Sequence, residues 1–225
     1  MISLMSSYNY TKLVSVTKPV VEGLFNSEDL IAYIARASNP SNQLNVATAP
    51  RLLKYCVEHK HWSPFEHASM TVEIKTTRAI AAQILRHRSF SFQEFSQRYS
   101  KVFSFQIPSL REQAATNRQS STKQIEDKSL SDYFVKAIDY AHKVYVDLIK
   151  RGVAKECARM VLPLCTETTL YMTGNCRSFI HYIELRTQED TQKEHRDIAT
   201  EIKSIFVEQF PHVAEALRWD SLNNI

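Results

Sequence analysis

One short segment before residue 100 concentrates the residue types that could do chemistry in this chain. Three potential cations, Arg86, His87 and Arg88, stand side by side, and Ser96 and Arg98 follow them. So many fixed hydrogen-bond donors are costly to bury unless anionic or polar partners satisfy them. Guanidinium groups bind phosphate through paired hydrogen bonds, so the segment predicts a site for one or more phosphate groups. The alternative is a solvated basic helix end, where cations suit the helix dipole.

The glycine count limits how such a site could be built. The chain contains three glycines, Gly23, Gly152 and Gly174. The GxGxxG dinucleotide loop and the GxxxxGKS/T phosphate loop both need closely spaced glycines, so neither motif exists here. Any bound nucleotide must therefore be held by arginines, hydroxyl groups and helix N-termini.

Composition indicates an ordinary globular protein. The 225 residues are 44% hydrophobic and 23% charged, and the formal net charge is +4. We expect one domain over residues 1–225, large enough to bury a full core. The four cysteines form no CxxC pair, and we see neither a signal peptide nor a run near the ~18 apolar residues of a membrane span. These features predict a cytoplasmic protein with free thiols and without a membrane partner.

Hydrophobic periodicity predicts the elements that must position the basic segment. Met70, Val72 and Ile74 alternate with polar residues, which is typical of a half-buried strand, and Thr77 can cap an alanine-rich helix after it. The alternation is too interrupted for a doubly wound sheet. We expect an α+β fold: a single mixed domain with a central, mainly antiparallel sheet flanked by helices. The predicted strands are 13–16, 70–74, 103–107 and 166–173, and the predicted helices are 28–36, 50–58, 79–86, 133–149, 155–160, 175–186 and 191–209.

The local expectations around the basic segment are more specific. A helix over 79–86 would carry Gln83, Arg86 and His87 on one face, because they lie three and four residues apart. Residues 89–100 and 111–124 are polar and lack periodicity, so both predict loops. Gly174 and Asn175 predict a chain turn, and Asn175 can cap the helix that follows.

The basic segment also resembles a known signature. Arg-His-Arg, followed after seven residues by Ser96, is similar to the signature of the flavin-dependent thymidylate synthases. Four further blocks resemble that family, in the same order and at compatible spacing: 61–67, 158–163, 175–177 and 185–194. The basic block itself continues through 94–99. His181 and Thr191 depart from the family, where asparagine and alanine are frequent.

The resemblance implies an activity and a set of site residues. The activity would be methylation of dUMP to dTMP, with FAD as cofactor, NADPH as reductant and methylenetetrahydrofolate as carbon donor. The enzyme would be a homotetramer whose sites are shared between subunits, and no nucleic-acid partner would be expected. The implied flavin residues are Arg86, His87, Arg88, Glu94, Asn175, Cys176, Arg177, His181 and, from a neighbouring subunit, Ser63. The implied dUMP residues are Gln83, Arg86, Glu94, Phe95, Ser96, Gln97, Arg98, Arg159 and Arg186, with His61 and Tyr99 on the folate side.

Arg186 would carry the central role in that chemistry. A nucleophilic uracil C5 requires negative charge to build on the ring carbonyls, and a guanidinium at the ring edge would stabilise it by about 3–4 kcal/mol if it resembles an oxyanion donor. Hydride transfer would be left to the reduced flavin. The alternative for Arg186 is a helix C-terminal cation on the surface.

Two competing functions remain open from the residues alone. His59, His61 and His67 could serve a metal-dependent phosphohydrolase, although their spacing is not a strong zinc pattern and we expect no metal. The basic segment with its aromatic residues could bind RNA. No cysteine has the histidine and acid that would activate a thiolate, and Cys176, at a helix start, is the only one with a reason for a lowered pKa.

Overall fold

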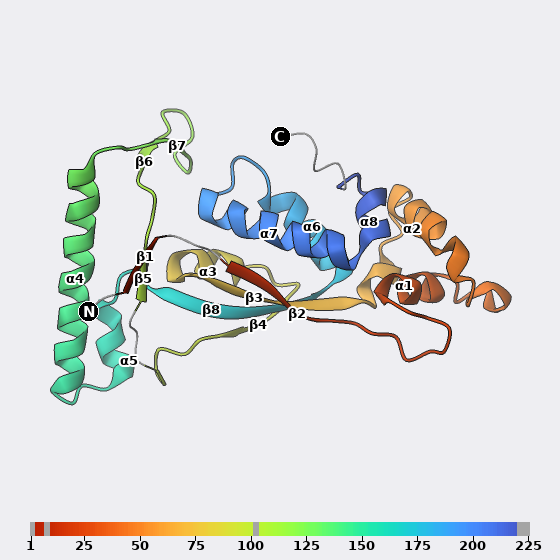
Figure 1. The fold of residues 1–225 in the computed structure, drawn as a ribbon, viewed down its shortest axis with the longest axis horizontal. Coiled ribbons are helices and arrows are strands. Elements are labelled where there is room, and N and C mark those ends of the chain that lie inside the picture. Colours follow the sequence, from red (N-terminus) through yellow and green to blue (C-terminus); the bar gives the residue numbers. More distant parts are fainter. Residues whose placement is uncertain (1–2, 7–9, 101–103, 220–225) are drawn as a thin grey trace.

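In the computed structural model, which describes residues 3–6, 10–100 and 104–219, an antiparallel sheet of four strands runs through the middle of the molecule (Figure 1). The strand order is β2-β3-β8-β4, and β3 and β8 pair along their full length. Their side chains alternate, so Met70, Val72 and Ile74 lie on the buried face. The strands are β2 (Tyr10–Val16), β3 (Ser69–Thr77), β8 (Glu167–Asn175) and β4 (Ser91–Glu94).

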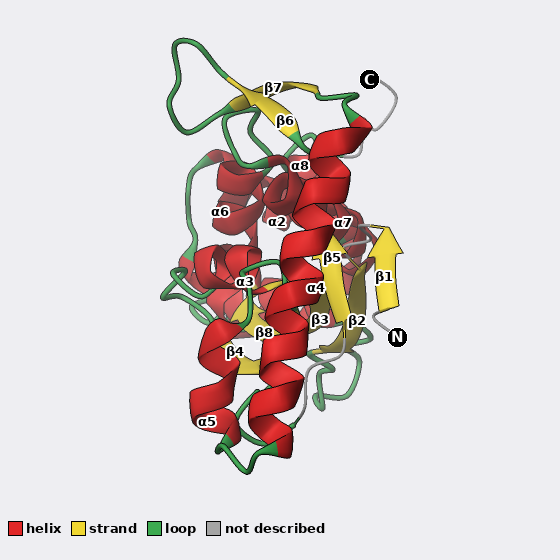
Figure 2. Cartoon of the chain, turned by 90° about the vertical axis from the view of Figure 1, so that its left-hand side faces the viewer, coloured by secondary structure: helices red, strands yellow, loops and turns green. Residues whose placement is uncertain are grey.

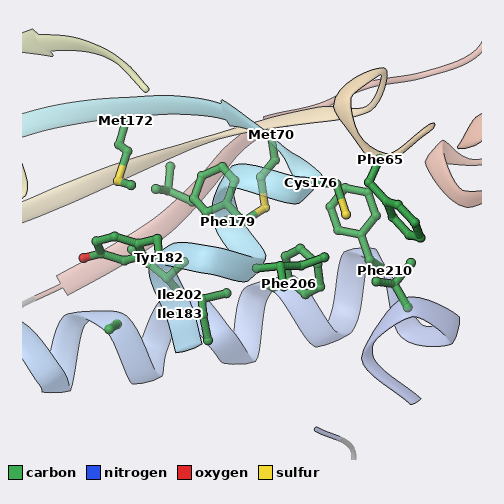
Figure 3. Close-up of a cluster of buried hydrophobic side chains, with 14 of the residues drawn as sticks. Phe65, Met70, Met172, Cys176, Phe179, Tyr182, Ile183, Ile202, Phe206 and Phe210 are labelled. Carbon is green, nitrogen blue, oxygen red and sulfur yellow. The ribbon is translucent and has the colours of Figure 1, made fainter. Parts of the chain in front are cut away.

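Helices α6 (Cys176–Arg186) and α7 (Lys193–Gln209) cover one face of this sheet (Figure 1). Met70 and Met172 of the sheet meet Phe179 of α6 and Phe206 of α7 in the main core (Figure 3). Each fully buried side chain of this kind contributes roughly 1.5–3 kcal/mol. Around this layer lie α1 (Ser27–Ala35), α2 (Ala49–Glu58), α3 (Arg78–Ile84) and α8 (Pro211–Ala216), with short 3-10 turns at Pro40–Asn42, Val46–Thr48 and Ser63–Glu66.

A long helix, α4 (Lys128–Lys150), runs along one end of the molecule (Figure 2). Of its 23 residues, Ile138 and Tyr145 are buried, whereas Tyr133 and Tyr140 are 75% and 72% exposed. Beside it lie α5 (Lys155–Ala158), a 3-10 turn at Arg159–Val161, and β5 (Ser104–Ile107), which pairs in parallel with β1 (Ser3–Ser6). No helix in the described ranges is long and apolar enough to cross a bilayer.

The α+β architecture predicted from periodicity is confirmed. The predicted caps are also present: Thr77 Oγ1 accepts from the N–H of Ile80, and Asn175 Oδ1 accepts from the N–H of Ser178. Each predicted strand and helix has a counterpart, although Phe103, at the start of one predicted strand, lies outside the described residues. The predicted last helix, 191–209, corresponds to α7, which ends at Gln209. Helix α8, which begins at Pro211, was not predicted.

Several local predictions are wrong, and each error has a tertiary cause. Residues 89–100 include β4, whose backbone pairs with the edge of β8. Residues 111–124 form a hairpin of β6 (Arg111–Gln113) and β7 (Ser121–Gln124). Gly174 continues β8 instead of turning the chain, since it pairs with Met70. Helix α3 ends at Ile84, so Arg86 and His87 follow the helix in turns and do not share its face with Gln83.

Candidate active site

The centre of the candidate site is a contact between the end of α6 and the turn after α3. Arg186, the last residue of α6, donates from Nε to Nε2 of His87 at 2.9 Å. Because Nε2 of His87 accepts this bond, the ring carries its proton on Nδ1. Burial, followed by the nearby charges of Arg186, His181 and Arg86, lowers the pKa of His87 to about 4. His87 is therefore neutral at physiological pH, and it orients a guanidinium without competing for anions.

The remaining donors of Arg186 are available to a ligand. Within the described part of the chain, its two terminal nitrogens form no hydrogen bond or ion pair. The residue is only partly exposed, so its charge is less screened than that of a surface arginine. A half-buried guanidinium with a fixed Nε and two free Nη groups is suited to a planar, oxygen-bearing ligand.

A cavity of about 470 Å³ lies beside this contact, on the outer side of α6. Its size falls within the roughly 300–1,000 Å³ typical of small-molecule and cofactor sites. Arg177 and His181, both implied flavin residues, line it together, and Arg177 Nη1 pairs with Glu66 Oε1 at 2.5 Å. The cavity is lined by Trp62, Glu66, Ser89, Arg177, Ser178, Ile180, His181 and Glu184.

Comparison with known proteins shows the family to which this chain belongs. A family model described as "Thymidylate synthase complementing protein" matches residues 20–212. A "Probable flavin-dependent thymidylate synthase" of Paramecium bursaria Chlorella virus 1 is 53% identical over 212 residues, covering 92% of this chain and 98% of the viral protein. The chain belongs to the flavin-dependent thymidylate synthase family. It is therefore an enzyme, as the resemblance of its sequence blocks implied.

Two further proteins are similar to this member of the flavin-dependent thymidylate synthase family, one in sequence and one in structure. A "Flavin-dependent thymidylate synthase" of Synechocystis sp. is 48% identical and covers 92% of this chain and 99% of its own. Among solved structures, a "UMP/dUMP methylase PolB from Streptomyces cacaoi bound with 5-Br dUMP" superposes with a TM-score of 0.83 at 27% identity, covering 96% of this chain and 97% of that one. The fold is thus shared with an enzyme of the same reaction class.

The family residues expected around dUMP fall into two groups. One group surrounds Gln83 and Arg186 at α6 and α7, where Gln83 Nε2 donates to Gln192 Oε1 at 2.7 Å. The second group lies at α5 and the turn after it: Arg98 pairs with Glu156 at 3.2 Å, and Lys155 Nζ donates to the carbonyl of Tyr99 at 2.6 Å. Helices α5 and α6 stand apart in both views (Figures 1 and 2).

The second group contains buried donors without partners. Gln97 is 7% exposed, and its Nε2 forms no hydrogen bond among the described residues; the same holds for Nε of Arg159. An unpaired buried donor costs about 1–3 kcal/mol, so such groups call for a ligand or a neighbouring chain.

Glu94 is held by a partner that the sequence did not indicate. Arg78, at the start of α3, pairs with Glu94 at 2.8 Å and donates to the carbonyl of Phe95 at 2.7 Å. Thr168 Oγ1 donates to Glu94 Oε1 at 3.0 Å. Arg78 thus holds the segment that follows β4 in place. It lies outside the sequence blocks that resemble the family.

The expected properties of Cys176 are wrong. Its thiol is fully buried in the main core, beside Phe65 and Met70 (Figure 3). Burial raises the pKa of this thiol well above its ordinary range, and the charge of Glu28 raises it further. Position at a helix start would lower a pKa, but desolvation is the larger effect here. The thiol of Cys176 is therefore not available to a bound cofactor, and its main-chain N–H already donates to the carbonyl of Ala68 at 2.8 Å.

The remaining predicted residues lie on the surface. Ser63 begins the 3-10 turn beside the cavity, and Arg86, Arg88 and His61 are exposed. His59 Nδ1 contacts the carbonyl of Tyr55 at 2.9 Å, and its ring stacks on that tyrosine. Across the described ranges, no group of three or more His, Cys, Asp or Glu side chains could hold a metal ion.

Proposed function

We propose that this protein methylates dUMP to dTMP, with methylenetetrahydrofolate as carbon donor, NADPH as reductant and FAD as cofactor. The observation that carries the proposal is the contact between Arg186 and neutral His87, because it presents two free guanidinium nitrogens at a fixed angle. The family assignment supplies the reaction class.

Arg186 is the proposed activating residue. As uracil C5 becomes nucleophilic, negative charge builds on the ring oxygens, and the free nitrogens of Arg186 stabilise that charge. A fixed donor of this kind is typically worth about 2.7–4 kcal/mol in the transition state. His87 contributes by holding Nε, so that the guanidinium does not have to be ordered when dUMP binds.

The cavity beside α6 is the proposed flavin site. Its volume and its mixture of Trp62, Arg177 and His181 fit a ring with an attached anionic group. When bound, FAD supplies hydride transfer, which no side chain of this protein could perform. The other residues proposed to hold FAD are Arg86, His87, Arg88, Glu94, Asn175 and, from a neighbouring subunit, Ser63.

Sharing of sites between subunits accounts for the separation of the dUMP residues. Gln83 and Arg186 belong to one group, whereas Gln97 and Arg159 belong to the group at α5, with unpaired buried donors. In a homotetramer, the second group of one subunit would complete the first group of another. The exposed tyrosines of α4 support contact with other subunits. Light scattering of the purified protein tests the tetramer.

The direct test is a spectrum followed by an activity assay. The purified protein should show flavin absorbance bands, and it should release tritium from 5-³H-dUMP only when methylenetetrahydrofolate and NADPH are both added. Omitting each compound in turn is the control. A protein that takes up no FAD, or that releases no tritium with every component present, would refute the proposal. Metal content and salt-dependent RNA affinity, measured on the same sample, test the two competing functions.

A further inference from the structure

A chain of side-chain hydrogen bonds runs from the core to Gln83, behind the proposed nucleotide site. The Tyr182 hydroxyl contacts His195 Nε2 at 3.0 Å, and His195 Nδ1 contacts Gln83 Oε1 at 3.2 Å. Gln83 Nε2 then donates to Gln192 Oε1 at 2.7 Å, and Gln192 Nε2 donates to Glu194 Oε2 at 3.0 Å. Three helices are thus joined by side-chain hydrogen bonds: α6 through Tyr182, α7 through His195, and α3 through Gln83.

In every bond of this hydrogen-bonded series, the donor is on the Tyr182 side and the acceptor is on the Glu194 side. The groups at the two ends of the series require this direction. Burial raises the pKa of Tyr182 above its ordinary value, so the phenol stays protonated and can donate to His195 Nε2. Burial is also the largest cause that lowers the pKa of His195 to about 3, so the ring is neutral, with its proton on Nδ1, facing Gln83. At the other end Glu194 is ionised, since its carboxylate pairs with Arg111 at 2.7 Å, and it can only accept.

Gln83 is therefore held in one of two orientations that would otherwise be nearly equal in energy. A carboxamide flipped by 180° would set its oxygen against the oxygen of Gln192 and its NH₂ against the N–H of His195. The observed orientation leaves one N–H and one oxygen lone pair of Gln83 for a ligand. The sequence carries no sign of this, because His195 lies on the core face of α7, where apolar residues are the rule.

The burial of His195 and Tyr182 supports a role beyond packing. Both side chains are fully buried although both carry polar groups. An apolar pair of similar shape would fill the same space without the cost of desolvating those groups. We propose that His195 is a positioning residue for nucleotide binding, which acts by fixing the carboxamide of Gln83, with Tyr182 fixing His195 in turn. This inference rests on the proposed function, in which Gln83 contacts dUMP.

The test compares variants of the FAD-loaded enzyme by calorimetric titration with dUMP. His195→Leu should weaken dUMP binding about tenfold, or about 1.4 kcal/mol. His195→Asn should restore most of the affinity, because an asparagine amide lies near the position of the histidine Nδ1–H. Tyr182→Phe should give a smaller loss, about threefold, since only the tautomer of His195 is released. Phe206→Leu is the matched control: it removes core packing from the same helix and should leave dUMP affinity unchanged.

A double-mutant cycle distinguishes a positioning role of His195 from a merely structural one. In a Gln83→Ala background, His195→Leu should have no further effect on dUMP affinity, because the group that it orients is gone. Equal affinity of His195→Leu and wild type, or an undiminished loss in the Gln83→Ala background, would overturn the inference. If His195→Leu does not fold, His195→Gln replaces it, since its longer amide cannot keep both bonds. A wild-type enzyme that fails to bind dUMP would instead refute the proposed function.

Discussion

Replacement of Arg186 by alanine tests the centre of the proposed mechanism. Among the residues that the structure describes, the side chain of Arg186 makes one hydrogen bond, from Nε to His87, and keeps two terminal nitrogens for a ligand. Loss of the bond to His87 should lower the free energy of unfolding by only about 1 kcal/mol. Loss of both free donors should raise the activation barrier by about 2.7–4 kcal/mol, which is a 10²–10³-fold fall in kcat. Arg186→Lys should not restore the rate, because a lysine lacks the Nε that His87 orients.

The assay separates turnover from cofactor binding. Flavin absorbance per subunit reports FAD content, and single-turnover release of tritium from 5-³H-dUMP reports the chemical step. We expect Arg186→Ala to keep its flavin and to lose dUMP-dependent release. The pKa of His87 should also rise toward its ordinary value, since the charge of Arg186 is one of the causes that lower it. Unchanged turnover, or loss of flavin together with turnover, would refute the role assigned to Arg186.

Three other predictions concern the flavin, the packing and the pH. Arg88→Ala should yield colourless protein, because Arg88 is proposed to bind FAD, and full retention of flavin absorbance would contradict that placement. Gly174→Ala should lower the free energy of unfolding by about 1–3 kcal/mol, because its Cβ would lie 2.4 Å from the ring of Phe90; Phe90→Leu in the same chain should recover part of this loss in urea unfolding. His87 and His195 have pKa values lowered to about 4 and 3, so the unfolded state binds more protons than the folded state below the ordinary histidine pKa of 6.5. Their stabilisation is complete above pH 6.5 and should fall as the pH drops from 6.5 toward 4, by up to about 1.4 kcal/mol per pH unit for each histidine. Urea unfolding at pH 7 and pH 5 checks this, and a His195→Leu variant with the same pH dependence as wild type would contradict it.

Local signals in the sequence were sufficient for most of the fold. Asn175 and Thr77 cap their helices as predicted, because capping depends on residues within one turn. Alternation along β3 marked one central strand, since one face of it is buried, and β-branched residues marked β8. The shortage of glycine excluded the common phosphate loops, and the order of the sequence blocks was enough to indicate the family.

Only the tertiary structure decided the environment of the site residues. The amide of Gln83 is oriented by residues 109 and 112 positions away, and no local pattern reports such a contact. The same holds for Cys176: its place at a helix start suggested a low pKa, whereas burial in the core raised it. A sequence determines which groups are present and which short-range bonds they form, but desolvation and long-range hydrogen bonds depend on what the folded chain packs around them.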